Sequence, residues 1–296
     1  MISKYLTIGC GDIGIQVAKK CRMHNWQVTA LSRSDRYASE FLSHSMTHLK
    51  GDLDLANFEL PQDISEYGIF YFAPPPNQGN TDPRIVKLLT LLPDKTSPKR
   101  IVYMSTTGVY GDCNGQWITE MTPTNPTVDR SKRRLDAERR VTEFCEQSKI
   151  GLVILRVAGI YGPGRLPVER IKSGTPVLSQ QEALPSNRIH AEDLAEICLK
   201  AMTAEHLNPV EIFNVADGNP STMSDYFFKV AELLKLPKPP EVDWQEAQKI
   251  FTPAMLSYLC EARKIDNTKL IKKLQVKLQY PDLVAGLQHI SVTNHV

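Results

Sequence analysis

The sequence predicts an α/β protein in which a doubly wound parallel sheet is followed by a smaller C-terminal lobe. Runs rich in β-branched and aromatic residues alternate with helical patterns through the first two-thirds of the 296 residues, as in βαβ units. A glycine motif stands between the first strand pattern and the first helix pattern. Beyond residue 162 the alternation gives way to polar, proline-containing sequence, which indicates a separate lobe.

The strand and helix patterns can be placed in order along the chain. The predicted strands are Lys4–Ile8, Gln27–Leu31, Met46–Leu49, Ile69–Ala73, Ile101–Ser105, Leu152–Val157 and Glu211–Ala216. The helix after the first strand carries Ile13, Val17 and Cys21 four residues apart, which produces one apolar stripe to pack on the sheet. A later helix is predicted to begin at Asp82, an N-cap residue followed by a first-turn proline.

Composition narrows the range of partners. The chain is 42% apolar and 23% charged with a net charge of +2, so no strong field toward nucleic acid or membrane surfaces is expected. Six scattered cysteines without metal-ligand spacing predict neither a disulfide framework nor a metal site. No stretch approaches 18 apolar residues, and the apolar N-terminus is too short for a signal peptide. These features favour a soluble, cytoplasmic protein.

The glycine motif predicts a phosphate-binding loop. In a G-x-G-x-x-G turn, the first glycine permits the tight turn, the second lets the backbone approach a pyrophosphate, and the third allows helix and strand to pack closely. The free amides and the helix dipole then bind the diphosphate. Because the motif follows a strand and opens an amphipathic helix, it predicts a Rossmann-type dinucleotide site at Gly9, Cys10, Gly11, Asp12, Ile13 and Gly14.

The residues at the end of the second strand indicate whether the site prefers NAD or NADP. NAD-specific proteins place an acidic residue about 20 residues past the motif to hold the ribose hydroxyls. This chain has Ser32-Arg33-Ser34 there. A carboxylate would repel a 2′-phosphate, whereas an arginine and two hydroxyls can bind it, so NADP is favoured over NAD. The alternative is an ordinary exposed arginine.

Further cofactor contacts are predicted at the carboxyl edge of the sheet. Asp52 and Leu53 follow the third strand, where the carboxylate could accept a hydrogen bond from the adenine amine; a loop-capping aspartate is the alternative. The remaining predicted cofactor contacts end the fourth and fifth strands: Phe72, Ala73, Pro74 and Ser105.

Four ordered motifs resemble those of the extended short-chain dehydrogenase/reductases, the NAD-dependent epimerase/dehydratase group. They are residues 105–111 (STTGVYG), 155–165 (LRVAGIYGPGR), 187–195 (NRIHAEDLA) and 213–218 (FNVADG). The resemblance spans roughly Ile8 to Gly218. It implies a nucleotide-binding core at residues 1–162, rejoined by 187–217, and a substrate lobe at 163–186 and 218–296. Within that lobe, Thr222 with Asp225 predicts a capping box before a helix over Tyr226–Lys235.

The resemblance also implies a triad in which a Ser or Thr orients the substrate, a Tyr transfers the proton and a Lys lowers the tyrosine pKa. Thr106 aligns with the Ser/Thr position; a strand-end hydroxyl bonded to backbone is the alternative. The Tyr-x-x-x-Lys element has no tyrosine. In one alignment Lys132 takes the lysine position, and Val128 then stands in place of the tyrosine. In the other, set by Glu138, Arg130 stands in place of the tyrosine and Arg134 in place of the lysine.

Other residues are candidates for the missing roles. Tyr110 and Tyr161 are candidate proton donors, although both stand in Tyr-Gly turns that pack in the family. The pKa of an unperturbed histidine suits proton transfer, but the resemblance favours a structural hydrogen bond from His190 to Asp193. Arg165 and Arg188 are candidates to bind a substrate phosphate, with salt bridges between the two lobes as the alternative.

Two functional hypotheses remain open. The first is an NAD(P)-dependent oxidoreductase or epimerase acting on a sugar-like or nucleotide-linked hydroxyl or carbonyl, with Thr106, Lys132 and Tyr110 as the catalytic candidates. A 4,6-dehydratase is disfavoured because Thr107-Gly108 stands where those enzymes carry Asp-Glu. The second is a catalytically impaired NADP-binding sensor. A homodimer through the helices that begin near Asp82 and Arg130 is a further expectation.

Overall fold

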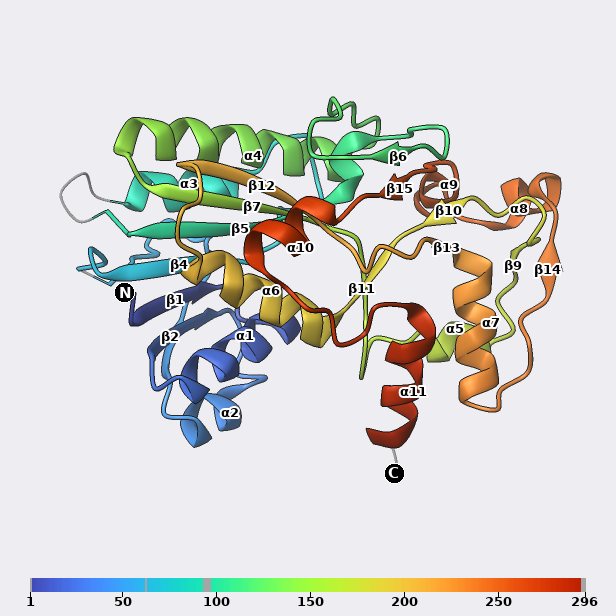
Figure 1. Ribbon diagram of the computed structural model, residues 1–296, viewed down its shortest axis with the longest axis horizontal. Coiled ribbons are helices and arrows are strands. Elements are labelled where there is room, and N and C mark those ends of the chain that lie inside the picture. Colours follow the sequence, from blue (N-terminus) through green and yellow to red (C-terminus); the bar gives the residue numbers. More distant parts are fainter. Residues whose placement is uncertain (1, 62, 93–96, 294–296) are drawn as a thin grey trace.

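The computed structural model describes residues 2–61, 63–92 and 97–293, and the predicted α/β fold is confirmed (Figure 1). Seven parallel strands form one sheet in the order β12-β7-β5-β4-β1-β2-β3. Their bounds are β1 Lys4–Ile8, β2 Gln27–Ser32, β3 Thr47–Lys50, β4 Tyr67–Tyr71, β5 Arg100–Thr106, β7 Gly151–Val157 and β12 Val210–Val215. Every predicted strand is present, with its ends displaced by at most two residues.

Helices cover both faces of the sheet, which explains why its central strands are apolar on both sides. On one face lie α1 (Asp12–Met23) and α6 (Ala191–Thr203), and on the other lie α3 (Pro83–Leu91) and α4 (Asp129–Ser148). Each pair encloses its own apolar cluster with the sheet. The short α2 (Ala38–Ser43) precedes the edge strand β3.

Both predicted N-cap residues are confirmed, but only the start of α3 was predicted correctly. The Asp82 side chain accepts hydrogen bonds from the amides of Arg84 and Ile85, and Pro83 is the first residue of α3. Thr222 caps α7 (Met223–Leu233) by accepting from the Asp225 amide at 3.0 Å. The capping box therefore starts that helix at Met223, three residues before the predicted Tyr226, because the N-cap residue directly precedes the first turn.

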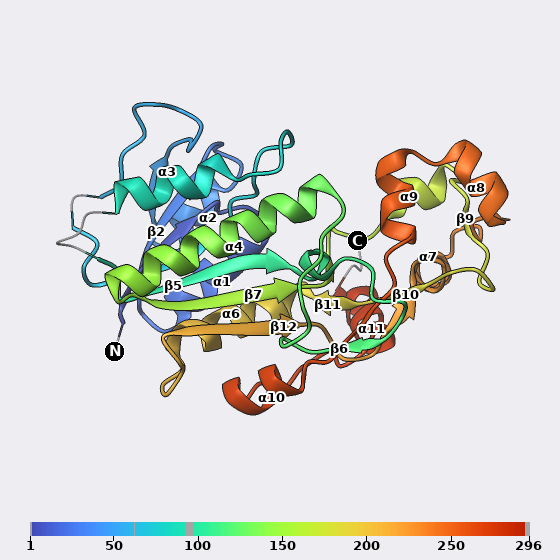
Figure 2. The same ribbon diagram turned by 90° about the horizontal axis from the view of Figure 1, so that it is seen from above.

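A smaller part of the chain lies beyond the carboxyl ends of the strands (Figure 2). Its core joins α5 (Val168–Lys172), α7 and α11 (Leu283–Thr293). The other elements here are β9 (Val177–Leu178), β10 (Pro185–Ser186), β13 (Ser221–Thr222), β14 (Glu241–Val242), α8 (Trp244–Ile250) and α9 (Pro253–Leu259).

Short elements connect this part to the sheet. The strand β8 (Gly159–Tyr161) pairs with β11 (Arg188–His190), and β6 (Trp117–Ile118) pairs with β15 (Lys264–Ile265). The 3₁₀ turn η1 (Thr107–Tyr110) follows β5, and α10 (Thr268–Leu274) packs beside β12.

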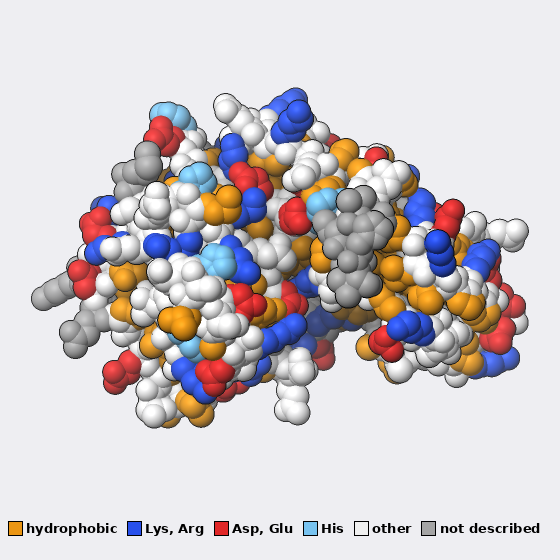
Figure 3. All heavy atoms as spheres, turned by 90° about the horizontal axis from the view of Figure 1, so that it is seen from below, with side chains coloured by type: hydrophobic (Ala, Val, Ile, Leu, Met, Phe, Trp, Pro, Cys, Tyr) orange, Lys and Arg blue, Asp and Glu red, His pale blue; other side chains and the backbone are white. Residues whose placement is uncertain are grey.

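The surface mixes apolar and charged side chains, and a recess separates the larger and smaller parts of the molecule, with basic side chains at its edge (Figure 3). In the described part of the chain, no helix combines the length and the apolarity needed to cross a membrane.

Candidate functional site

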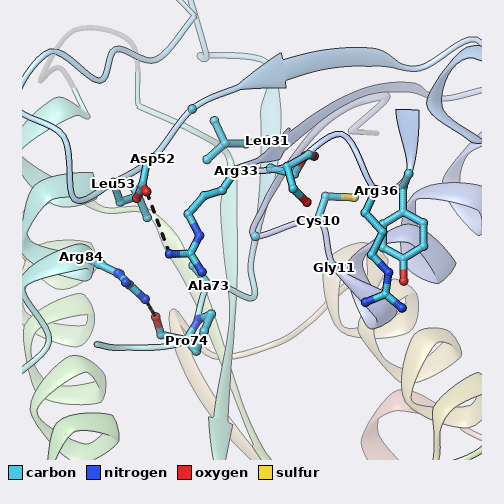
Figure 4. Close-up of a pocket in the computed structure, with 15 residues that line it drawn as sticks. Cys10, Gly11, Leu31, Arg33, Arg36, Asp52, Leu53, Ala73, Pro74 and Arg84 are labelled. Atoms are coloured by element: carbon cyan, nitrogen blue, oxygen red, sulfur yellow. Dashed lines mark hydrogen bonds and ion pairs between the residues drawn. The ribbon is translucent and has the colours of Figure 1, made fainter. Parts of the chain in front are cut away.

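The glycine motif forms one wall of a cavity of about 240 Å³ at the carboxyl edge of the sheet, which we call the glycine-loop pocket. Its other walls come from the ends of β2, β3 and β4 (Figure 4). The predicted cofactor residues that line it are Gly9, Cys10, Gly11, Ser32, Arg33, Ser34, Asp52, Leu53, Ala73 and Pro74.

The three motif glycines are needed for different reasons. Gly9 has φ +80°, and a Cβ there would lie 2.5 Å from the Ala73 nitrogen. A Cβ on Gly14 would lie 3.2 Å from the Gly9 carbonyl oxygen, so this glycine lets α1 pack closely on the turn. Gly11 differs, because its nearest neighbour would be 4.0 Å away. The protein's own packing does not require a glycine at residue 11, and the open space beside it belongs to the pocket.

The start of α1 is also available to a ligand. Gly11 is its N-cap residue and no side chain caps the helix, so the first-turn amides lack a side-chain acceptor. Asp12, Ile13 and Gly14 do not line the pocket. Asp12 instead accepts a hydrogen bond from Tyr37 and lies 3.4 Å from Arg36 and 3.3 Å from Arg165.

Arg33 dominates the end of the pocket formed by β2 and β3. Its guanidinium extends toward Asp52, with Nη1 4.0 Å from Oδ2, and its side chain is 60% exposed (Figure 4). Ser32 Oγ donates to the Ser34 carbonyl at 2.9 Å and also contacts His48 Nε2 at 2.9 Å. These groups leave the arginine loosely held and able to turn toward an anion.

The nearest acid after β2 points elsewhere. Asp35 pairs with Lys50 at 2.5 Å and does not line the pocket. Arg84 lines it but is held by both oxygens of Asp54, at 2.7 and 2.5 Å, and by the Pro74 carbonyl. Arg84 and Arg36 were not among the predicted cofactor residues, because neither stands in the glycine motif or at a strand end.

Two predicted cofactor residues lie behind the pocket rather than in its wall. Phe72 is buried in the core, and only the following Ala73 and Pro74 reach the pocket. Ser105 is also buried, where its hydroxyl donates to Glu138 Oε1 at 2.5 Å. The alternation of side chains along a strand explains both cases, since a residue one position from the edge points into the core.

A second cavity of about 600 Å³, which we call the arginine cavity, adjoins the first at Pro74. Thr106, Thr107 and Gly108 line it from the end of β5 and the following turn. Six arginines also line it: Arg130, Arg133, Arg134, Arg165, Arg188 and Arg263.

Thr106 stands where the strand enters the cavity. Its Oγ1 accepts a hydrogen bond from the Gly108 amide at 3.2 Å, the backbone contact considered above as the alternative to a substrate role. The hydroxyl hydrogen is still free to be donated to a ligand oxygen. The contact therefore orients the hydroxyl without using its donor.

The orientation of α4 decides which basic residues face the cavity. Glu138 is buried and accepts hydrogen bonds from Ser105 Oγ and from Arg156 Nη2, the latter at 2.7 Å. Burial alone would lower the pKa of Arg156, but the hydrogen bonds that Arg156 donates to Glu138 and the charge of that carboxylate together raise it. This contact fixes one stripe of α4 against the sheet, and residues 130 and 134 continue that stripe.

Lys132 is therefore not brought to the site. It does not line the arginine cavity, and its Nζ lies 3.4 Å from Asp129 Oδ1 on the same helix. The prediction of a catalytic Lys132 is corrected here for a geometric reason. A residue two positions from Arg130 or Arg134 points to another face of the helix.

Tyr110 is likewise not in the cavity wall. It is 1% exposed, donates to Asn214 Oδ1 at 2.7 Å, and packs against Arg156 at 4.8 Å. Burial raises its pKa. The candidate role for Tyr110 in proton transfer is corrected accordingly, and its side chain joins η1 to β12.

The remaining candidates near the lobe have structural partners. Tyr161 lines the cavity, is buried and donates to the Asp282 carbonyl at 3.1 Å. His190 caps α6 by accepting from the Glu192 amide, and burial lowers its pKa to about 4. The expected bond to Asp193 is not formed, because that carboxylate accepts from the Gln279 and Tyr280 amides.

Arg165 and Arg188 both line the arginine cavity but are held differently. Arg165 makes the ion pair to Asp12 described above, which joins the lobe to the start of α1. Arg188 is 6% exposed, stacks over Tyr226 at 4.2 Å and donates to Ser186 Oγ at 2.8 Å. Burial lowers its pKa.

Comparison with known proteins agrees with the motifs. The model of the NAD dependent epimerase/dehydratase family matches residues 84–216. The chain resembles this family. The predicted resemblance is thereby confirmed, and the match includes β5 and α4, which both contribute residues to the wall of the arginine cavity.

Individual relatives extend over nearly the whole chain. Protein YeeZ of Escherichia coli K12 is 24% identical over 292 residues, covering 95% of this chain and 97% of YeeZ. A functionally unknown conserved protein from Silicibacter pomeroyi is 26% identical with a TM-score of 0.83, covering 99% of this chain and 100% of its own. MoeE5 in complex with UDP-glucose and NAD has a TM-score of 0.75 at 17% identity, covering 98% and 97%. At that identity the likeness shows the shared fold.

Proposed function

We propose that this protein binds NADP in the glycine-loop pocket and uses it on a sugar-like or nucleotide-linked hydroxyl or carbonyl in the arginine cavity. Three aspects support the proposal: the fit of the pocket to a dinucleotide, the basic residues at its far end, and the position of Thr106. The chain resembles a family named for NAD-dependent epimerases and dehydratases. One solved structure with a similar fold, MoeE5, contains UDP-glucose and NAD.

The observation that carries the proposal is the open space beside Gly11. Gly9 and Gly14 are required by contacts within the protein, whereas Gly11 is not. The uncapped start of α1 and this glycine together form a surface of backbone amides that suits a diphosphate. Bound there, the nicotinamide cofactor would supply or accept a hydride.

Arg33, Ser32 and Ser34 support NADP in preference to NAD. They end β2 at the place where an acid would hold the ribose hydroxyls of NAD. Arg33 is held only at 4.0 Å by Asp52, so a 2′-phosphate can compete for its guanidinium. We infer that Asp52, which lines the same end, lies beside the adenosine.

Thr106 is the residue best placed to position a substrate. It ends β5, lines the arginine cavity and keeps a free hydroxyl donor. A hydrogen bond from that hydroxyl would orient a substrate oxygen near the junction of the two cavities at Pro74. Arg165 and Arg188 would bind the more distant part of the substrate.

Preference for NADP is tested by replacing Arg33. Loss of a charge-assisted hydrogen bond is worth about 1.5–3 kcal/mol, so Arg33→Ala is expected to weaken NADPH binding roughly ten- to a hundredfold and to leave NADH binding unchanged. Isothermal titration of both cofactors measures this. Arg139→Ala, an exposed position on α4, is the matched control. Equal affinity for the two cofactors in the unaltered protein would overturn the NADP assignment.

Turnover is tested with NADPH and a panel of keto-sugars. Oxidation of NADPH that Thr106→Val abolishes, with NADPH affinity retained, supports the catalytic proposal. Turnover that survives Thr106→Val rules out Thr106 as the positioning group.

A second candidate function is a catalytically impaired NADP-binding sensor. The observation that favours it is specific: Arg130 and Arg134 face the cavity from α4 where the family carries Tyr and Lys, and Tyr110 is buried against Asn214. Tight NADPH binding with no hydride transfer to any substrate of the panel would favour this candidate.

We further propose that the core and lobe divide as the sequence indicated, that the protein is cytoplasmic, and that two copies pair through α3 and α4. These two helices lie side by side on one face of the sheet. Size-exclusion chromatography with light scattering tests the pairing, and a monomer at micromolar concentration would contradict it.

A further inference from the structure

Most arginines of the arginine cavity have no ion-pair partner in the protein. Two of its six arginines have carboxylate partners: Arg263 pairs with Glu261 at 2.9 Å, and Arg165 with Asp12 at 3.3 Å. Among the described residues that line the cavity, Glu261 is the one acidic residue. Within the described ranges, Arg130, Arg133, Arg134 and Arg188 have no carboxylate oxygen within 4.0 Å.

Three of these four arginines form a cluster in the first turns of α4, and neutral groups hold each of them. Arg130 donates to Ser257 Oγ at 2.7 Å and stacks on Tyr258 at 3.7 Å. Arg133 donates to the Gly79 carbonyl, and Arg134 to the Met104 carbonyl at 3.0 Å. These contacts orient the guanidinium groups without neutralising them.

Arg133 is buried, so its unpaired positive charge costs free energy in the folded protein. It is 7% exposed, and its Nε has no hydrogen-bond partner. Burying a charge without a counter-charge costs several kcal/mol, so buried guanidinium groups are normally paired. The partial positive charge at the start of a helix adds to the cost rather than offsetting it. A bound anion would offset both.

The cluster lies at the reacting end of the proposed site. Gly108, two residues after Thr106, is so close to Ser131 that a Cβ on it would lie 2.7 Å from the serine hydroxyl. The first turn of α4 therefore packs directly on the turn that carries Thr106. Arg188 comes from β11 and stacks on Tyr226, so it belongs to a different wall of the cavity.

We propose that the part of the substrate nearest Thr106 itself carries an anionic group, a carboxylate or a phosphate, and that Arg133 and Arg134 bind it. Arg130 contributes to the same positive region. The inference rests on the proposed function for the location of the reacting end, and it narrows the substrate from sugar-like compounds in general to anionic ones. A neutral sugar would leave the arginine cluster uncompensated.

The test measures binding, so it does not require turnover. The full-length protein saturated with NADPH is titrated with three related probes: glucose, glucose 6-phosphate and glucuronate. We expect at least one anionic sugar to bind tenfold or more tightly than glucose, and the phosphate and carboxylate arms identify which group is preferred. Equal binding of all three probes, or no binding of the anionic ones, would overturn the proposal.

Substitutions in α4 test whether the arginine cluster is what binds the anionic sugar. Arg133→Gln and Arg134→Gln are each expected to reduce the affinity for the preferred anionic sugar tenfold or more. Arg139→Gln, on the exposed side of the same helix, is expected to leave it unchanged. Because Arg133 is buried, Arg133→Lys provides a charge-retaining variant that should recover part of the affinity. Unchanged affinity in both Gln variants would refute the assignment.

NADPH affinity is measured separately in every variant. If the unaltered protein binds NADPH normally but binds no anionic sugar, this inference is overturned and the proposed cofactor site is left intact. Failure of the unaltered protein to bind NADPH would instead contradict the proposed function, whatever the sugar probes show.

Discussion

The glycine-loop pocket and the arginine cavity adjoin at Pro74 but differ in how their charges are held. In the first, Arg36 and Arg84 are paired with aspartates, and the glycine motif is complete. In the second, four arginines have no carboxylate partner within the described residues, and the Tyr-x-x-x-Lys element is absent. The glycine-loop pocket thus keeps the residues expected for a dinucleotide site, whereas the arginine cavity has arginines without carboxylate partners in place of the Tyr-x-x-x-Lys element.

The largest expected effect comes from removing the anchor of α4. Glu138→Ala would leave Arg156 buried and unpaired, at a cost of about 3–5 kcal/mol in the free energy of unfolding. Urea denaturation measures this loss, with Arg139→Ala as a control expected to change stability by less than about 0.5 kcal/mol. If Glu138→Ala were as stable as the control, the register of α4 would not depend on this ion pair.

A pH-dependent effect is expected behind the arginine cavity, at Asp217. Burial raises the pKa of Asp217 to about 7, while one of its oxygens accepts from the Asn219 amide and the other has no partner. The folded state therefore holds a proton that the unfolded state releases above pH 4. Stability should fall as pH rises from about 4 to 7, because over that range the folded protein binds more protons.

Asp217→Asn removes this titration and keeps the side-chain shape. The variant should be more stable than the unaltered protein at pH 8, by about 4 kcal/mol, and nearly equal to it at pH 4. Denaturation curves collected across this range measure the difference. Parallel pH profiles for the two proteins would show that Asp217 does not titrate in the folded state.

The glycine-loop pocket is probed by contrasting two of its glycines. Gly9→Ala places a side chain at φ +80°, 2.5 Å from the Ala73 nitrogen, and should destabilise the fold by about 2 kcal/mol or more. Gly11→Ala meets nothing closer than 4.0 Å and should leave the thermal midpoint nearly unchanged while weakening NADPH binding tenfold or more. Normal NADPH affinity in Gly11→Ala would mean that no ligand approaches this backbone.

Features that depend only on residues close together along the chain could be predicted from the sequence. The glycine motif, the alternating strand and helix patterns, and the caps at Asp82 and Thr222 each act within a few residues along the chain. For that reason the strands in their order along the chain and most residues of the glycine-loop pocket could be predicted. Arg36 and Arg84 were missed because only the packing of α3 and of the loop after β2 brings them there.

Only the tertiary structure decides how the arginine cavity is built. The run from Arg130 to Arg134 is compatible with several helix orientations, and the sequence left two registers open. Contacts with Arg156 and Ser105, 18 and 33 residues from Glu138, select the one that turns Arg130 and Arg134 toward the cavity and Lys132 away from it. Helical periodicity determines which residues share a face, but only distant packing partners determine where that face points.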